Sequence, residues 1–347
     1  MLNTFSSAIL LLMCTSSMAY AQLVPIDEHE LSNTTGQAFI NVDHTSGDSL
    51  DFTKVTLGLD VKTSLNADLL ELGNYTRDGV AGSDIKINDF ALGKVDSSGN
   101  IIPFEIKDPF IELAFDKSSG QQNLVGVRLG FGGAKGALSG NIESLTGNVN
   151  VDIKDTAQAL NFAGEDANLI GRVLSALGPT LLGNSPLNAQ AVLVDDAGDR
   201  NAIRSTQVGI ENGKEFEIDA SGVGNVSRGL LGVTFALLPN ASCTNGCRDI
   251  TLISQGCELV GGISSCFSLS DYKTLEVGNK QSDGSFDFAE GLSLSFQSQQ
   301  IVWQGTGGVV AEKGAFLNVP NGGLEVTLQE ALVGTARVRT KYVDPYF

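Results

Sequence analysis

Four cysteines in the second half of the chain have the spacing of a small disulfide framework. Cys243, Cys247, Cys257 and Cys266 lie close together in the sequence. In a secreted chain an even number of clustered cysteines predicts two disulfides, for which three pairings are possible. A zinc site is the alternative, but the spacing C-x3-C-x9-C-x8-C lacks the C-x2-C pairs typical of four-cysteine zinc sites. We therefore predict two disulfides that pin a segment at residues 240–270, and the pairing stays open.

The sequence contains few histidines that could take part in catalysis or metal binding. The chain contains 2 histidines, His29 and His44, and both precede the first strongly patterned strand. Catalysis by a Ser-His-Asp or Cys-His set requires a histidine held rigidly beside the nucleophile. The nucleophile elbow G-x-S-x-G and the zinc motif H-E-x-x-H are absent from the sequence. The sequence therefore predicts a non-enzymatic protein with no catalytic residues, no metal ligands and no cofactor.

Clusters of aspartate and glycine are the remaining candidates for chemistry. Asp195, Asp196 and Asp199 resemble half of a calcium-binding turn, without the full twelve-residue loop that ends in a glutamate. Residues 96–100 and 283–285 are similar fragments. Hairpin turns use the same residue types without a metal, so we interpret all three clusters as turns. Calcium binding at residues 195–199 stays open.

The elements that must position such residues are mostly strands. Val55, Leu57, Leu59 and Val61 alternate with polar residues, which is the period of a half-buried strand. The same alternation recurs at residues 85–87, 111–115, 125–131 and 149–153. Turn-forming clusters separate these runs, at residues 96–100, 117–120 and 132–133. An antiparallel meander is therefore predicted over about residues 50–155.

One segment has helical spacing instead. Leu169, Ile170, Val173, Leu174 and Leu177 recur with the period of a helix, and Gly178-Pro179 follows them. We predict one amphipathic helix at about residues 165–177, able to pack across the open sheet. Strand-like runs then resume, at residues 191–194, 216–218, 230–233, 292–296 and 324–328. The predicted fold is all-β: an antiparallel meander or sandwich-like body forming a single domain at residues 51–347.

Composition limits the kinds of partner. The chain has 22 Lys and Arg against 40 Asp and Glu, a net charge of −18, and 42% hydrophobic residues. Such an acidic chain repels nucleic acid and anionic membrane surfaces. Its hydrophobic content is sufficient for a folded core. We therefore expect protein partners or a hydrophobic ligand, and no nucleic acid.

The first residues have the anatomy of a secretory signal peptide. A short apolar run, residues 8–13, is followed by Ala19-Tyr20-Ala21, a small-x-small cleavage site. We predict cleavage before Gln22, a signal peptide at residues 1–21 and a polar lead-in at residues 22–50. No other apolar run reaches the length of about 20 residues that a membrane-spanning helix needs. The mature chain is therefore expected to be exported, without a transmembrane helix.

Several segments resemble exported proteobacterial proteins that carry a domain of unknown function. The similar segments are Leu23–Glu28, Glu30–Ser32, Thr35–Ala38, Ser83–Gly93, Asp108–Phe115 and Ala336–Tyr342. A few of those proteins are labelled as pilus- or filament-associated. The resemblance implies a Gram-negative envelope location, in the periplasm, at the outer membrane surface or outside the cell, and it supplies no site residues.

These observations predict a non-enzymatic exported protein of the cell envelope with a structural, adhesion or pilus-associated role and other envelope or surface proteins as partners. The alternative is a periplasmic or outer-membrane carrier that holds a hydrophobic ligand, such as a lipid, between the apolar sheet face and the predicted helix. Pockets of that kind are lined mainly by apolar side chains. The same side chains serve equally well as an ordinary core.

Overall fold

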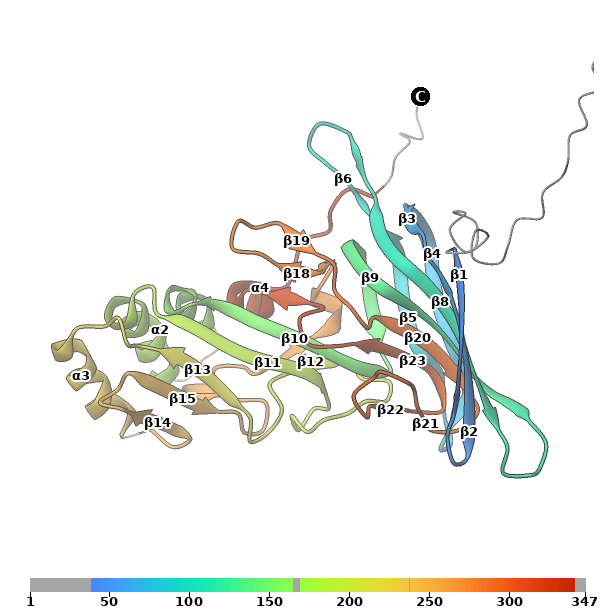
Figure 1. Cartoon of the computed structure of the whole chain (residues 1–347). Helices are drawn as coiled ribbons and strands as arrows, with labels where there is room; N and C mark the ends of the chain where they lie inside the picture. The colour runs from blue at the N-terminus through green and yellow to red at the C-terminus, as the bar shows by residue number, and fades with distance from the viewer. Residues whose placement is uncertain (1–38, 165–168, 237, 341–347) are drawn as a thin grey trace, which may run out of the picture. The chain divides into compact units, whose positions relative to one another are not determined.

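The computed structural model describes residues 39–164, 169–236 and 238–340 (Figure 1). Strands make up most of these residues and helices are few, so the predicted all-β class is confirmed. The predicted signal peptide and residues 22–38 of the lead-in lie outside the described residues. In the part of the chain that the structure describes, none of the helices has the length and hydropathy needed to cross a membrane.

The first sheet contains most of the predicted meander. Its strands are antiparallel and follow one another in the order β1 (Ile40–Ser46), β2 (Leu50–Leu57), β8 (Phe104–Asp116), β9 (Asn123–Ser144), β20 (Ser293–Gln297) and β23 (Gly314–Val319). A short strand, β3 (Asp60–Thr63), pairs with the first part of β8. Strand β1 lies in the segment predicted as a polar lead-in, so the sheet begins earlier in the sequence than expected.

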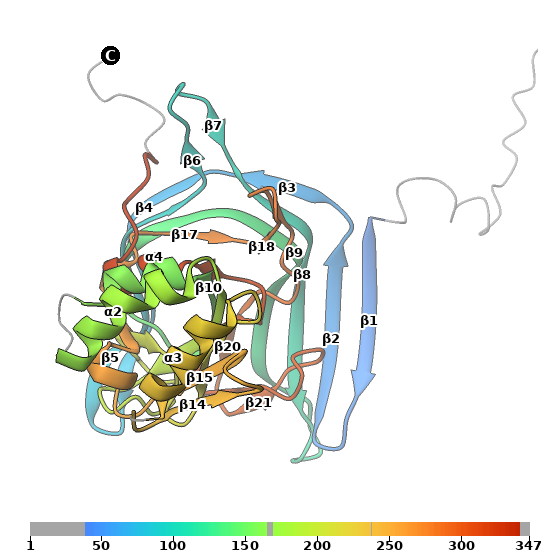
Figure 2. The same ribbon diagram turned by 90° about the vertical axis from the view of Figure 1, so that its left-hand side faces the viewer.

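The long strand β9 belongs to two sheets because it bends (Figure 2). Beyond the bend its residues pair with β5 (Val80–Leu92) and β17 (Thr274–Val277), and β5 pairs with β4 (Leu65–Arg77). Gly136, near the bend, has a φ of 128°, a backbone conformation that glycine adopts without a steric penalty. Three further hairpins have strands of only two residues each. They are β6 (Lys94–Val95) with β7 (Ile101–Ile102), β18 (Asn279–Lys280) with β19 (Phe286–Asp287), and β21 (Ile301–Val302) with β22 (Val310–Ala311).

Strand β10 (Gly147–Thr156) connects the first sheet to a further one. Its first residues run parallel to β23, and its later residues pair with β11 (Pro186–Val194) and, in parallel, with β24 (Glu325–Val326). The further strands are β12 (Gln207–Gly209), β13 (Glu215–Asp219), β14 (Ala241–Thr244), β15 (Asp249–Ile253) and β16 (Cys266–Ser268). The parallel pairings join residues far apart in sequence, so the body is not a simple meander.

The helices differ from the prediction in number and extent. The predicted helix exists as α2 (Leu169–Leu182), but it continues through Pro179 instead of ending before it. A proline inside a helix costs one backbone hydrogen bond, and the amide of Gly183 closes the end by donating to the carbonyl of Pro179. Two further helices, α3 (Asn225–Phe235) and α4 (Leu328–Val333), were not predicted. The run at residues 230–233, predicted as a strand, lies in α3.

Helix α2 does not cover the open face of the first sheet. It packs against the 3-10 helix η1 (Ala157–Gly164), against the short 3-10 turn η2 (Val260–Gly262) and against α3. In Figure 1 these elements lie over strands β10–β15, away from β2 and β8. The open face of the first sheet is therefore not covered by the predicted helix.

Two hydrophobic cores hold these layers together. The larger joins β5, the second part of β9, β10–β15 and the helices. The smaller lies on one face of the first sheet, where Phe52, Ala114 and Phe316 pack under Ile301 and Trp303 of the β21–β22 region. The β21–β22 region therefore covers one face of the first sheet.

The four cysteines form two local disulfides within the predicted segment. Cys243 pairs with Cys247 at the end of the β14–β15 hairpin, and Cys257 pairs with Cys266 at the start of β16. Both bridges close short loops, with sequence separations of 4 and 9. The sequence left the pairing open, and in the structure the first cysteine pairs with the second and the third with the fourth.

Removing the longer bridge should have the larger effect on stability. The double variant Cys257→Ser/Cys266→Ser should lose about 2–3 kcal/mol of unfolding free energy, because the loop-closure entropy grows with loop length. The Cys243→Ser/Cys247→Ser variant should lose less. Urea unfolding followed by circular dichroism measures both, and equal losses would show that loop entropy does not dominate.

Candidate functional site

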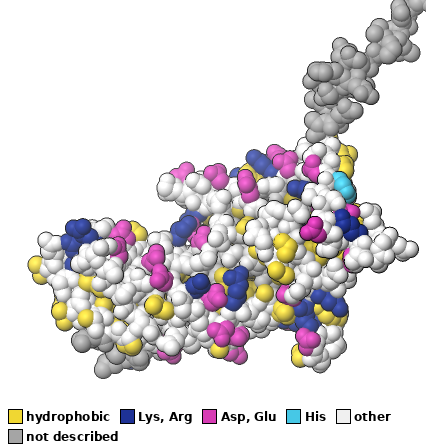
Figure 3. Space-filling model, turned by 60° about the horizontal axis from the view of Figure 1, so that its bottom comes forward, with side chains coloured by type: hydrophobic (Ala, Val, Ile, Leu, Met, Phe, Trp, Pro, Cys, Tyr) yellow, Lys and Arg dark blue, Asp and Glu magenta, His cyan; other side chains and the backbone are white. Residues whose placement is uncertain are grey.

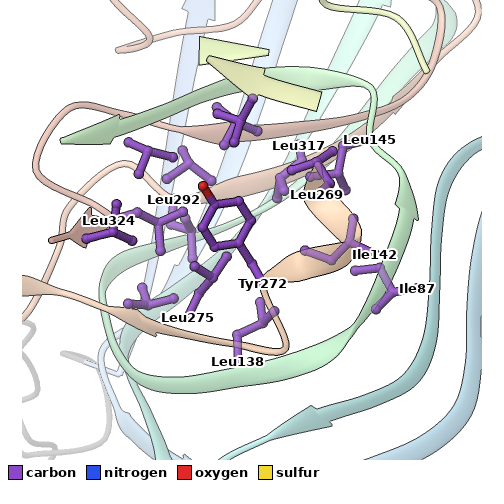
Figure 4. Close-up of a pocket in the computed structure, with 16 residues that line it drawn as sticks. Ile87, Leu138, Ile142, Leu145, Leu269, Tyr272, Leu275, Leu292, Leu317 and Leu324 are labelled. Atoms are coloured by element: carbon purple, nitrogen blue, oxygen red, sulfur yellow. The ribbon is translucent and has the colours of Figure 1, made fainter. Parts of the chain in front are cut away.

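An apolar cavity lies inside the bend of β9 (Figure 4). Its volume is about 80 Å³. Every lining side chain is aliphatic except one tyrosine: the residues are Ile87, Leu138, Ile142, Leu145, Val149, Val151, Val208, Leu269, Tyr272, Leu275, Val277, Leu292, Leu317, Val319, Leu324 and Val326. The cavity is the nearest match in the described residues to the predicted hydrophobic pocket, although strands and the segments between them, and not helix α2, line it.

Tyr272 is the one polar group in the cavity wall. Its side chain is 4% exposed, and its hydroxyl donates a hydrogen bond of 3.1 Å to the carbonyl of Ala331. Burial raises the pKa of the Tyr272 phenol far above its ordinary value, and the nearby Asp271 and Glu330 act in the same direction. The phenol is therefore neutral, and its hydrogen bond holds α4 against the cavity wall.

The size of the cavity determines what it can hold. Drug-sized ligands occupy pockets of about 300–1,000 Å³, and an engineered cavity of about 150 Å³ holds benzene. A cavity of about 80 Å³ is too small for a lipid chain. In this conformation the space is a packing void of the larger core.

A row of apolar side chains runs from this cavity to the free edge of the first sheet. Directly opposed residues in neighbouring strands lie on the same face of a sheet. The register places six of them in one line: Leu317, Leu294, Leu129, Ile111, Val55 and Val42, on β23, β20, β9, β8, β2 and β1. The cavity end of the line is covered by the larger core.

The other end of this row is open to solvent. Leu129 is 39% exposed, Ile111 49% and Val42 61%, and Ile40 and Leu124 on the same face are each 55% exposed. We call these five residues the apolar sheet face. Exposed apolar residues that form a contiguous group are typical of interaction surfaces, whereas scattered single ones need no explanation. The face shown in Figure 3 carries the scattered kind, with both signs of charge interspersed.

Within the described residues, strand β1 leaves its outer edge unpaired. Among the described residues its only strand partner is β2, and in Figure 2 it lies at the margin of the sheet. The carbonyl of Phe39 accepts from the amide of Gly58 and the amide of Gly47 donates to Leu50, so odd-numbered residues point their backbone groups toward β2. The backbone groups of Ile40, Val42 and His44 therefore point outward, because successive residues alternate. A free edge of this kind is a template for pairing with another strand.

The opposite face of the same sheet holds a buried ion pair. Glu112 and Arg128 face each other across β8 and β9, with side chains 1% and 6% exposed. Arg128 Nε donates to Glu112 at 2.7 Å, and its Nη2 donates to the carbonyl of Gln304 at 2.8 Å. Burial raises the pKa of Glu112 and lowers that of Arg128, so desolvation outweighs their attraction in both groups. The pair is structural, because Trp303 and Phe110 cover it.

The aspartate cluster forms a turn. Asp195 Oδ1 accepts from the amides of Ala197 at 2.9 Å and Asp199 at 3.0 Å. Asp199 accepts from Asn212 and Asp196 from Gln207, so each carboxylate has a protein donor. In the described ranges no three metal-ligating side chains lie close enough to hold an ion. The turn interpretation of residues 195–199 accounts for this geometry.

The structure describes one of the two histidines. His44 lies exposed on β1, with its Nδ1 3.3 Å from Thr53 Oγ1, and His29 lies outside the described residues. Sequence reasoning missed the edge strand, although Ile40, Val42 and His44 alternate with polar residues in the printed sequence.

Comparison of the chain with protein-family models, with curated proteins and with solved structures found no match.

Proposed function

We propose that this protein is a non-enzymatic exported protein of the cell envelope or cell surface, with a structural, adhesion or pilus-associated role. The observation that carries the proposal is the apolar sheet face beside the free edge of β1. Edge strands with an apolar face bind extended partners by adding a strand, in which backbone hydrogen bonds supply affinity and side chains supply specificity. The two disulfides support export, because such bonds persist in oxidising compartments.

Site-specific photo-cross-linking in the native host tests this proposal. A photoreactive residue at Ile111, in the centre of the apolar sheet face, should cross-link to an envelope or surface protein. The control position is Val333, which is 65% exposed on α4, and which should give no discrete product. Absence of a discrete product at Ile111, or robust turnover of esters, glycans or peptides by the purified protein, would contradict the proposal.

A hydrophobic carrier is the second candidate, and the cavity inside the bend of β9 is the observation that favours it. Binding a lipid would require this cavity to widen several-fold. Native mass spectrometry of protein from its own host, with solvent extraction in parallel, distinguishes the two functions. An extra mass that extracts into solvent would support the carrier, and a bare mature mass with two disulfides would exclude it.

A further inference from the structure

The free edge of β1 has a self-complementary pattern. The backbone N–H and C=O groups of Ile40, Val42 and His44 point away from β2. An added strand can form hydrogen bonds with them only if residues whose backbone groups point toward β1 lie directly opposite these three. A second copy of β1, turned by a two-fold axis, meets this condition with Val42 on the axis. Ile40 then faces His44 of the second copy, and three hydrogen-bonded residue pairs form.

Side chains on the other face of β1 favour the same register. With Val42 on the axis, Asn41 faces Asp43 of the second copy, an amide opposite a carboxylate. Within one copy these side chains already form a hydrogen bond of 2.8 Å between Asn41 Nδ2 and Asp43 Oδ2. Moving the two-fold axis from Val42 to Asp43 would place Asp43 opposite Asp43 of the second copy. Like charges directly opposed are destabilising, so this register is disfavoured.

From this register we infer that the occupant of the β1 edge is a second copy of the same chain, paired antiparallel about Val42. The pairing extends the apolar row across the axis, because Val55, Ile111 and Leu129 of each copy continue the line through Val42. Closed two-fold pairing of this kind satisfies both free edges at once. The inference rests on the proposed function, because it names the partner of that same surface.

Opposite charges at position 42 test the pairing, because this residue faces itself. Val42→Lys alone and Val42→Asp alone should each weaken self-association by at least about tenfold, since like charges meet on the axis. An equimolar mixture of the two variants should restore the dimer. Sedimentation velocity over a range of concentrations measures the mass, and circular dichroism verifies that each variant is folded.

The matched control is Val233→Lys, because Val233 on α3 is 65% exposed and Val42 is 61% exposed. This variant should associate like the unmodified protein. A protein that is monomeric at every concentration, or single variants that associate normally, would overturn the inference. If Ile111 still cross-links to a different envelope protein in that case, the proposed function stands and only the identity of the partner is wrong.

Discussion

Replacing Asp84 by alanine is expected to lower the free energy of unfolding by about 3–5 kcal/mol, the cost of leaving buried charged partners uncompensated. Asp84 on β5 is fully buried and accepts a hydrogen bond of 3.2 Å from Arg204 Nε and one of 2.9 Å from the amide of Ala315. Arg77 forms an ion pair with the same carboxylate at 3.5 Å. Removing this group leaves Arg204 and Arg77 without their carboxylate and takes away an acceptor of the buried Ala315 amide.

The same carboxylate joins segments that are remote in sequence. Arg204 also donates to the carbonyls of Val80 at 3.0 Å and Tyr75 at 2.8 Å, and so ties the loop before β12 to the β4–β5 hairpin. Gly314 completes the junction, because a Cβ at this residue would clash with Asp84 Oδ2. Gly314→Ala should therefore also destabilise the fold.

Urea unfolding followed by the fluorescence of Trp303, the only tryptophan, measures these effects. The control is Asp68→Ala, because Asp68 on β4 is exposed and should change stability by less than about 0.5 kcal/mol. If Asp84→Ala and Asp68→Ala lowered the free energy of unfolding equally, the contacts of Asp84 would not stabilise the fold more than those of an exposed residue.

The buried pair Glu112–Arg128 should give a loss of similar size when only one partner is removed. Glu112→Ala is expected to cost about 3–5 kcal/mol, because Arg128 would stay buried without a carboxylate. Replacing both residues with apolar ones, as in Glu112→Leu/Arg128→Met, should be close to neutral. Desolvation already outweighs attraction in this pair, as the raised pKa of Glu112 and the lowered pKa of Arg128 indicate.

A double-mutant cycle built from Glu112→Leu, Arg128→Met and their combination measures the coupling between the two residues. We expect strong non-additivity, with the double variant much more stable than Glu112→Leu or Arg128→Met alone. If the apolar double variant were as unstable as the single one, the ion pair would itself be a major source of stability, and its interpretation as an inert structural pair would be wrong.

Local patterns predicted the local parts of the fold. The alternation at residues 55–61 lies in β2 and β3, and the turn residues 96–100 and 117–120 join β6 to β7 and β8 to β9. Asp96 closes its turn by accepting from the amide of Asn100 at 2.8 Å, which is typical of such clusters. These features depend on neighbours in sequence, and the sequence therefore reveals them.

Features that depend on distant neighbours were not predictable. The run at residues 230–233 reads equally as strand or helix, and the buried positions Leu231 and Phe235, four residues apart, follow the helical period. Two partners of Asp84, Arg204 and Ala315, lie more than a hundred residues away in sequence, so spacing gave no sign of them. The free edge of β1 depends on which strands lie beside it, and a single sequence does not specify this.

Residue-resolved hydrogen exchange on protein isolated from its host in its native assembly shows whether a partner strand occupies the edge of β1. In the isolated chain the amides of Asn41 and Asp43 are bonded toward β2, whereas those of Val42 and His44 point to the free edge. We expect the amides of Val42 and His44 to exchange slowly in the assembly and rapidly after dilution to free protein. Rapid exchange at both residues in the assembly, while Asn41 and Asp43 stay protected, would show that no partner strand occupies the edge of β1.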